Sequence, residues 1–281
     1  MEITICVKVI KLPFIFYSQP NSVYLCLLLK KKIMLLSDLL NEPLLLLLLP
    51  IVAFLYASVG HGGASGYIAV MSLFALPISV IKPTALVLNI LVSGISFYFY
   101  YREKKFDFKL FYPFAITSIP CSYFGGLLTV ETHYYKIILA SVLIIAVLRL
   151  LGVFGKEKPV LKSINIPLAL LIGAIIGFLS GLIGIGGGIV LSPVILLFGW
   201  ANMKQTAAVS ALFIFVNSIA GLFGFVSKGG SLPLSSTVMV GVVLVGGILG
   251  TYYGSKKFNT ATLRNVLAFV LGIAILKLYT T

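Results

Sequence analysis

Apolar segments of membrane-spanning length, separated by short clusters of basic residues, run through most of the chain. A helix needs about 20 mostly apolar residues to cross the hydrocarbon core of a bilayer. The composition agrees, because 60% of the 281 residues are hydrophobic and only 10% are charged, which no ordinary soluble domain shows. The sequence therefore predicts an all-α, polytopic membrane protein and excludes a soluble enzyme.

Full membrane spans are expected where the apolar runs are longest. They are residues 43–60, 83–101, 110–129, 134–151, 166–183, 206–226, 237–253 and 262–279. Two further apolar stretches, 64–77 and 188–199, follow clusters of glycine and are short for a full crossing at a rise of about 1.5 Å per residue. We expect eight spans, with these two stretches as half-helices or re-entrant helices, or ten spans if both stretches cross.

The chain also repeats itself, which is typical of secondary transporters. Residues 59–64 correspond to 183–188, residues 82–85 to 204–207, and residues 148–150 to 276–278, always in the same order. These anchors indicate a duplication. They predict a first membrane repeat over 34–158 and a second over 159–281, each with four full spans and one short helix after a glycine-rich break.

The first 33 residues do not fit this pattern. They mix apolar residues with Pro13, Pro20 and the basic run 30–32, and a more regular pattern begins at Met34. We expect residues 1–33 to be an N-terminal extension or a peripheral segment outside the working fold. A targeting segment is the alternative, although the basic and apolar parts do not follow the order of a signal peptide.

The formal charge of +14 reflects 21 basic and seven acidic residues. The basic residues flank the apolar segments, where they orient spans and contact anionic lipid head groups, so no nucleic-acid partner is expected. The most basic short loops, 102–109 and 149–162, are separated by two spans, and we expect both on the cytoplasmic side. The loop with Lys256 and Lys257 is cytoplasmic only if ten spans and inverted halves are assumed.

The carboxylates limit which solutes the chain can carry. All seven lie outside the apolar cores of the spans: Glu2, Asp38, Glu42, Glu103, Asp107, Glu131 and Glu157. Buried carboxylates are typical of proton and metal-cation pathways, so their absence from the spans favours an anion. The three cysteines are scattered without metal-ligand spacing, and we expect no metal and no cofactor.

The two glycine clusters are the candidate binding motifs. Glycines break a span and let backbone N–H groups approach a ligand, and the following half-helix begins with unpaired N–H groups and the positive end of its dipole. Together these features favour an anion. The predicted substrate-binding residues are the motif glycines and neighbouring polar side chains: Gly60, His61, Gly62, Gly63, Ser65, Thr84, Gly184, Gly186, Gly187, Gly188, Ser192 and Thr206. The alternative is close helix packing through small residues.

Three polar side chains in these regions have two interpretations each. His61 either hydrogen-bonds an anion or caps backbone carbonyls at the break, and Ile185 stands at the equivalent position of the second repeat. Asn89 and Asn217 lie within spans, where they either line the path or hydrogen-bond between helices.

The chain lacks the sequence motifs of ATP-driven pumps and of common hydrolases. Neither glycine cluster continues into the Gly-Lys-Ser/Thr of a phosphate-binding loop, and the chain has no GxSxG or HExxH pattern. The sequence therefore favours a secondary transporter over an ATP-driven pump or an enzyme. The rival hypothesis is a membrane scaffold or assembly factor whose glycines serve helix packing.

At the two glycine motifs the chain resembles the TauE/SafE family of sulfite exporter-like permeases. The similarity rests on residues 56–67, YASVGHGGASGY, and on residues 181–188, GLIGIGGG, with Pro193 after them. It extends over about Met34 to Tyr279 and includes the duplicated layout. The resemblance implies a permease of the bacterial inner membrane that exports small sulfur-containing anions, such as sulfite or organosulfonates.

Overall fold

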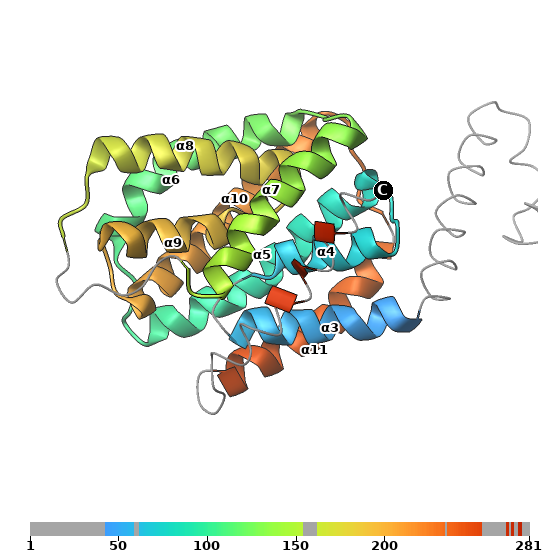
Figure 1. The fold of residues 1–281 in the computed structure, drawn as a ribbon, viewed down its shortest axis with the longest axis horizontal. Coiled ribbons are helices and arrows are strands. Elements are labelled where there is room, and N and C mark those ends of the chain that lie inside the picture. Colours follow the sequence, from blue (N-terminus) through green and yellow to red (C-terminus); the bar gives the residue numbers. More distant parts are fainter. Residues whose placement is uncertain are drawn as a thin grey trace, which may run out of the picture.

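The computed structural model describes residues 43–58, 62–153, 162–233 and 235–254, together with 268, 269, 271, 272, 275 and 276. Over these residues the chain forms nine helices and no strand, which confirms the all-α prediction (Figure 1). The helices are α3 (Pro43–Ser58), α4 (Ala64–Leu73), α5 (Ile78–Arg102), α6 (Phe108–Leu127), α7 (Thr132–Leu150), α8 (Ile166–Ile183), α9 (Gly188–Phe198), α10 (Met203–Ser227) and α11 (Ser235–Gly254).

Three of these helices are long and apolar enough to cross a membrane: α5, α8 and residues 204–227 of α10. Both stretches that the sequence predicts as short helices are short in the structure, since α4 has 10 residues and α9 has 11. Of the last expected span, 262–279, the structure describes only residues 268, 269, 271, 272, 275 and 276, so this span stays untested. The eight-span arrangement in two halves stays a prediction.

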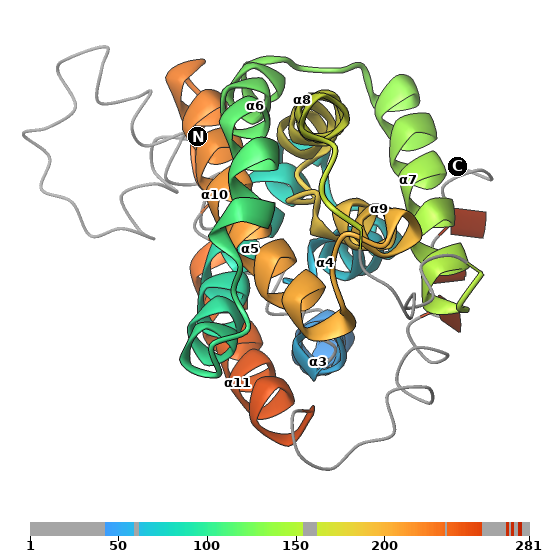
Figure 2. The same ribbon diagram turned by 90° about the vertical axis from the view of Figure 1, so that its left-hand side faces the viewer.

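The two short helices lie in the interior of the bundle. Figure 2 shows α4 and α9 between α8 and α3, with α5, α6 and α10 on one side and α7 on the other. In the same bundle α6 packs along α8 and α10, α5 packs along α10, and α3 packs along α11. The two breaks, from which α4 and α9 begin, therefore open toward the centre of the molecule.

Glycines at four-residue spacing bring the long helices into backbone contact. Gly173, Gly177 and Gly181 of α8 face α6, where an added Cβ would collide with the backbone of Phe114, Ser118 and Ser122. On α11, Gly246 and Gly250 meet α3 in the same way, at the backbone of Pro50 and Phe54. Small residues at this spacing are the usual means of close helix packing in membranes. Apart from Gly181, these glycines lie outside the two motifs.

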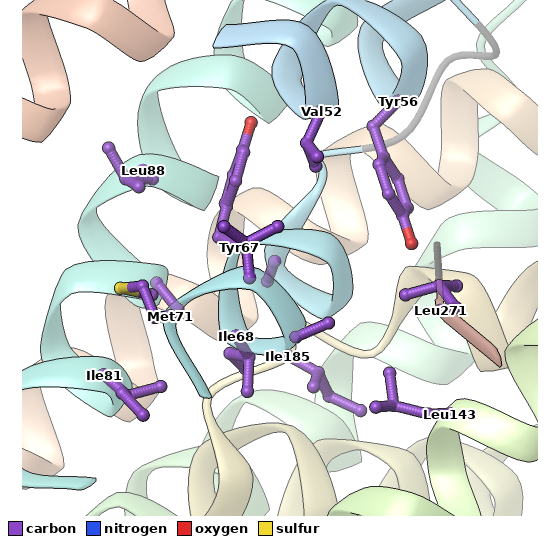
Figure 3. Packing of buried hydrophobic residues seen from close by; sticks show 14 of the residues in the cluster. Val52, Tyr56, Tyr67, Ile68, Met71, Ile81, Leu88, Leu143, Ile185 and Leu271 are labelled. Atoms are coloured by element: carbon purple, nitrogen blue, oxygen red, sulfur yellow. The ribbon is translucent and has the colours of Figure 1, made fainter. Parts of the chain in front are cut away.

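Apolar side chains from both breaks share one core around α4. Figure 3 shows Tyr67, Ile68 and Met71 of α4 beside residues of α3 and α5, with Ile185 of the second break close to them. Ile185 is 5% exposed. In the second repeat, the position that corresponds to His61 is therefore occupied by an apolar side chain of the core.

Candidate functional site

The first break lies between Ser58, where α3 ends, and Ala64, where α4 begins. Gly63, immediately before α4, has a φ of +92°, a conformation that residues with a Cβ rarely adopt. Gly60 and His61 lie outside the described residues, so both interpretations of His61 stay open. The break directs the N-terminus of α4, with the positive end of its dipole, toward the interior.

The second break joins α8 to α9 and contains three glycines with positive φ. Gly184, Gly186 and Gly187 have φ values of +93°, +73° and +76°. α9 follows at Gly188 and, like α4, begins at the break with the positive end of its dipole. Two helix N-termini, the structural element that proteins use most often to bind anions through the backbone, therefore start at related breaks.

The two breaks converge on the same two side chains. A Cβ added to Gly62 would lie 2.7 Å from Asn89 Oδ1 and 3.0 Å from Ile214 Cγ2. A Cβ added to Gly186 would collide with Asn89 Nδ2 and lie 2.8 Å from the same Ile214 carbon atom. Asn89 and Ile214 stand near the middle of α5 and α10, which have 25 residues each. The meeting point therefore lies near the mid-length of two helices that are long and apolar enough to cross a membrane.

Asn89 links the first break to α10. Its Oδ1 accepts a hydrogen bond from the Ala64 N–H at 3.0 Å, which is the first amide of α4, and its Nδ2 donates to Ser218 Oγ at 3.3 Å. Both bonds join α5 to another helix, so Asn89 fits the interhelical interpretation made from the sequence, and one of its partners is the first amide after the break. Asn217 also fits the interhelical interpretation, because its Nδ2 donates to Ser118 Oγ of α6 at 3.0 Å.

Each break also holds a buried hydroxyl group that has no hydrogen-bond partner in the described part of the chain. Tyr67 Oη lies against the first break, because a Cβ on Gly63 would be 2.7 Å from it. Ser180 Oγ is in the same situation at the second break, where Ser180 Cβ would lie 3.5 Å from a Cβ on Gly187. An unpaired buried hydroxyl costs about 1–3 kcal/mol. Both groups are donors that an oxyanion would satisfy.

Among the residues that the structure describes, no carboxylate lies at the breaks to compete with an anion. The described carboxylates all lie just outside helices: Glu103 follows α5, Asp107 precedes α6, and Glu131 precedes α7. Asp107 caps α6 by accepting a hydrogen bond from the Lys109 N–H. Nowhere in the described ranges do three His, Cys, Asp or Glu side chains gather as metal ligands would. The positive ends of the two helix dipoles and the buried Lys82, whose stem lies against Gly184, therefore favour an anion at the breaks, and no described carboxylate opposes them.

The hydroxyl groups predicted from the sequence differ in what they contact. Ser65 Oγ bonds Tyr56 Oη at 2.8 Å, Thr84 Oγ1 bonds Ser236 Oγ at 2.7 Å, and Ser192 Oγ bonds Ser210 Oγ at 2.8 Å. Thr206 Oγ1 is buried and has no partner among the described residues. Three of the four hydroxyl groups thus already hydrogen-bond between helices. Of the predicted residues, the structure brings three glycines together around Ile214: Gly62, Gly186 and Gly188.

Four residues of this region were not predicted as binding residues from the sequence: Tyr67, Lys82, Ser180 and Ser218. Serine and tyrosine within an apolar span carry little signal of their own, because most of them hydrogen-bond between helices. Spacing offered a signal for Lys82, which precedes Asn89 by two helical turns and therefore shares its face of α5. Its side chain is 5% exposed.

Comparison with known proteins agrees with the motif resemblance. The family described as "Sulfite exporter TauE/SafE" matches residues 45–278. A protein of Sinorhizobium fredii named a probable membrane transporter is 36% identical over 81% of this chain and 94% of its own length. A protein of Methanocaldococcus jannaschii with the same kind of name is 28% identical over 82% of this chain and 94% of its own. No solved structure matches the chain.

Proposed function

The chain belongs to the sulfite exporter TauE/SafE family of membrane transporters, and on that premise we propose that it is a secondary permease for small sulfur-containing anions. Sulfite and organosulfonates are the substrate class, and the bacterial inner membrane is the proposed location. Each substrate presents several oxygen atoms with negative charge, which backbone N–H groups and neutral hydroxyl groups can bind together.

The observation that carries this proposal is the convergence of two glycine breaks on Asn89. Three features there favour an oxyanion: the N-termini of α4 and α9, the hydroxyls of Tyr67 and Ser180, which have no hydrogen-bond partner among the described residues, and the lack of any described carboxylate at the breaks. We assign substrate binding to the motif glycines, with Tyr67 and Ser180 as additional donors. Ser65, Thr84 and Ser192 support the site from outside through their hydrogen bonds to neighbouring helices.

The proposed architecture is a pair of related halves, 34–158 and 159–281, that rock around the anion. In repeat-built transporters the substrate binds near the bilayer midplane at the interface of the repeats, where broken helices form the site. The contacts of Gly62 and Gly186 with Asn89 and Ile214 fit that arrangement, because each half contributes one break and one long helix. The mechanism needs no bound cofactor.

Export is the proposed direction. An inside-negative membrane potential drives each negative charge outward by about 2.3 kcal/mol per 100 mV. Because the spans contain no carboxylate, they offer no obvious relay for coupled protons. Uncoupled efflux is therefore energetically sufficient for a substrate that the cytoplasm produces.

The test is sulfite flux in liposomes that contain the purified full chain, under an imposed potential. Wild-type protein should carry sulfite toward the positive side, at a rate that rises with the potential. The variant Gly62→Val should lose the flux, because its side chain would displace Asn89, while Gly241→Val, at a position with open space, should retain it. Folded protein without potential-dependent flux of any sulfur oxyanion would refute the proposal.

A further inference from the structure

Lys82 is a buried basic side chain in the first turns of α5, and it contacts the C-terminal end of α6. Its Nζ donates to the carbonyl oxygens of Gly126 and Leu128 at 3.4 and 3.3 Å, and it lies 5.9 Å from the centre of the Phe225 ring. Both hydrogen bonds are longer than the usual 2.7–3.2 Å. Two long bonds to neutral carbonyls and one ring face compensate only part of the charge.

No carboxylate balances this charge within the ranges that the structure describes. Glu131, the nearest carboxylate in sequence to the end of α6, is exposed and forms no ion pair with Lys82. A buried ammonium group without a counter-charge is costly in any protein and more so in a membrane. The corresponding lysine of the second repeat, Lys204, is exposed, so the repeat as such does not require burial.

The position of Lys82 connects the second break with the surface. A Cβ on Gly184 would lie 3.2 Å from the Lys82 carbonyl oxygen and 3.3 Å from its Cγ, so the lysine stem passes directly over the break. On the other side, Lys228 Nζ donates to Thr129 Oγ1 at 2.9 Å, next to the Leu128 carbonyl that Lys82 contacts. Two ammonium groups thus bind adjacent residues, one buried and one exposed.

The buried face of α5 continues from Lys82 toward the meeting point of the two breaks. Asn89 follows Lys82 by seven residues, which is two helical turns and a distance of about 10 Å along the axis. Ser93 and Ser96 continue the same face, both are fully buried, and Ser96 Oγ has no partner among the described residues. A stripe of polar side chains thus extends along this helix, with its only basic member at one end.

We propose that Lys82 forms a second anion site, distinct from the breaks, which a small oxyanion occupies between the meeting point at Asn89 and the side of the membrane where α5 begins. The assignment rests on the proposed function, because the path it extends is that of the transported anion. Lys228 and Thr129 form the outer rim of this site. The bound oxyanion supplies the negative charge that the described protein does not.

The experiment compares wild type with Lys82→Met, which removes the charge but keeps much of the stem, and Lys82→Arg, which keeps the charge. Lys204→Met, at the exposed counterpart, is the matched control. The first measurement is the thermal stability of the purified full-length protein against sulfite and, separately, sulfate, with chloride holding ionic strength constant. A ligand that binds only the folded state raises its stability with concentration. The second measurement is sulfite flux as a function of concentration.

Wild type, Lys82→Arg and Lys204→Met should be stabilised by the oxyanions, whereas Lys82→Met should lose most of that response while melting no lower than wild type without anion. The KM of Lys82→Met for sulfite should rise at least about tenfold, because a hydrogen bond to a charged group corresponds to a factor of roughly 10–100 in an equilibrium constant. If Lys82 only caps α6, Lys82→Met melts lower and keeps the full anion response, which overturns the proposal.

The two proposals fail separately in this design. Suppose that oxyanions stabilise the folded protein only when Lys82 is present, but the protein transports no sulfur oxyanion. This result would support the second anion site and refute the transport function. If Lys82→Met transports sulfite with an unchanged KM, the second anion site is refuted and the proposed transport function is still supported.

Discussion

Replacing Gly186 by alanine tests whether the second break must approach Asn89 and Ile214 as closely as the structure has it. Gly186 has a φ of +73°, which a residue with a Cβ adopts only with strain. The new methyl group would collide with Asn89 Nδ2 and lie 2.8 Å from Ile214 Cγ2 and 3.0 Å from Ser218 Oγ. Asn89 Nδ2 and Ser218 Oγ end short side chains that hydrogen-bond to each other at 3.3 Å, so neither can move away without disturbing that bond.

Two terms determine the size of the effect. Left-handed backbone costs a non-glycine residue about 1–2 kcal/mol. Inserting a carbon atom into a packed region costs about 1–3 kcal/mol more through displaced neighbours. We therefore expect Gly186→Ala to lose about 2–5 kcal/mol of unfolding free energy and to abolish sulfite flux, because Asn89 must move away from the Ala64 N–H.

Two matched alanine variants separate the terms. Gly152 has a φ of +78° and open space around it, so Gly152→Ala carries the backbone strain alone. Gly241 has open space around it and does not have a positive φ, so its alanine variant should be neutral or slightly stabilising. Unfolding can be followed by the fluorescence of Trp200, the single tryptophan of the chain, which stacks on Phe198 with ring centres 4.8 Å apart. If Gly186→Ala has the same unfolding free energy and the same sulfite flux as Gly152→Ala, the inference that Gly186 must lie close to Asn89 and Ile214 is wrong.

Two further variants address the donors and the packing glycines. Tyr67→Phe removes a buried hydroxyl that has no partner among the described residues, so its unfolding free energy should rise by about 1 kcal/mol while its affinity for sulfite falls; a loss of stability with unchanged affinity would instead indicate a structural hydrogen bond. Gly177→Leu should prevent α6 and α8 from packing, because an added Cβ already meets the backbone of Ser118. It should therefore lower the yield of folded protein in a size-exclusion assay, and a normal elution profile would contradict the helix contact.

Hydropathy located the helices well where spans end at glycines or loops, and less well where a charge lies inside a helix. The predicted span 166–183 coincides with α8. The span predicted to begin at residue 83 instead belongs to α5, which begins at Ile78 and includes Lys82 and Pro83. A hydropathy pattern stops at a lysine, whereas the folded chain accommodates Lys82 because the carbonyls at the end of α6 receive its ammonium group.

The two glycine motifs were predictable because glycine clusters within apolar runs break helices in a recognisable way. Their convergence on Asn89 was not, since one sequence does not say which face of α5 meets the breaks. The sequence also does not distinguish glycines that permit close helix packing from glycines that adopt a positive φ. Gly173 and Gly177 bring helices together at ordinary helical dihedrals, whereas Gly184 and Gly187 need positive φ, and only coordinates distinguish these demands.

The account's central claim is that backbone N–H groups at the two breaks bind the transported anion. Hydrogen exchange of the full-length protein, measured by mass spectrometry with and without sulfite, tests it most directly because it reports on individual backbone segments. We predict that sulfite slows exchange in residues 62–66 and 184–189 and leaves the packing segment 173–181 and helix α11 unchanged. Exchange at both breaks that is unaffected by sulfite, at concentrations that saturate transport, would contradict the claim.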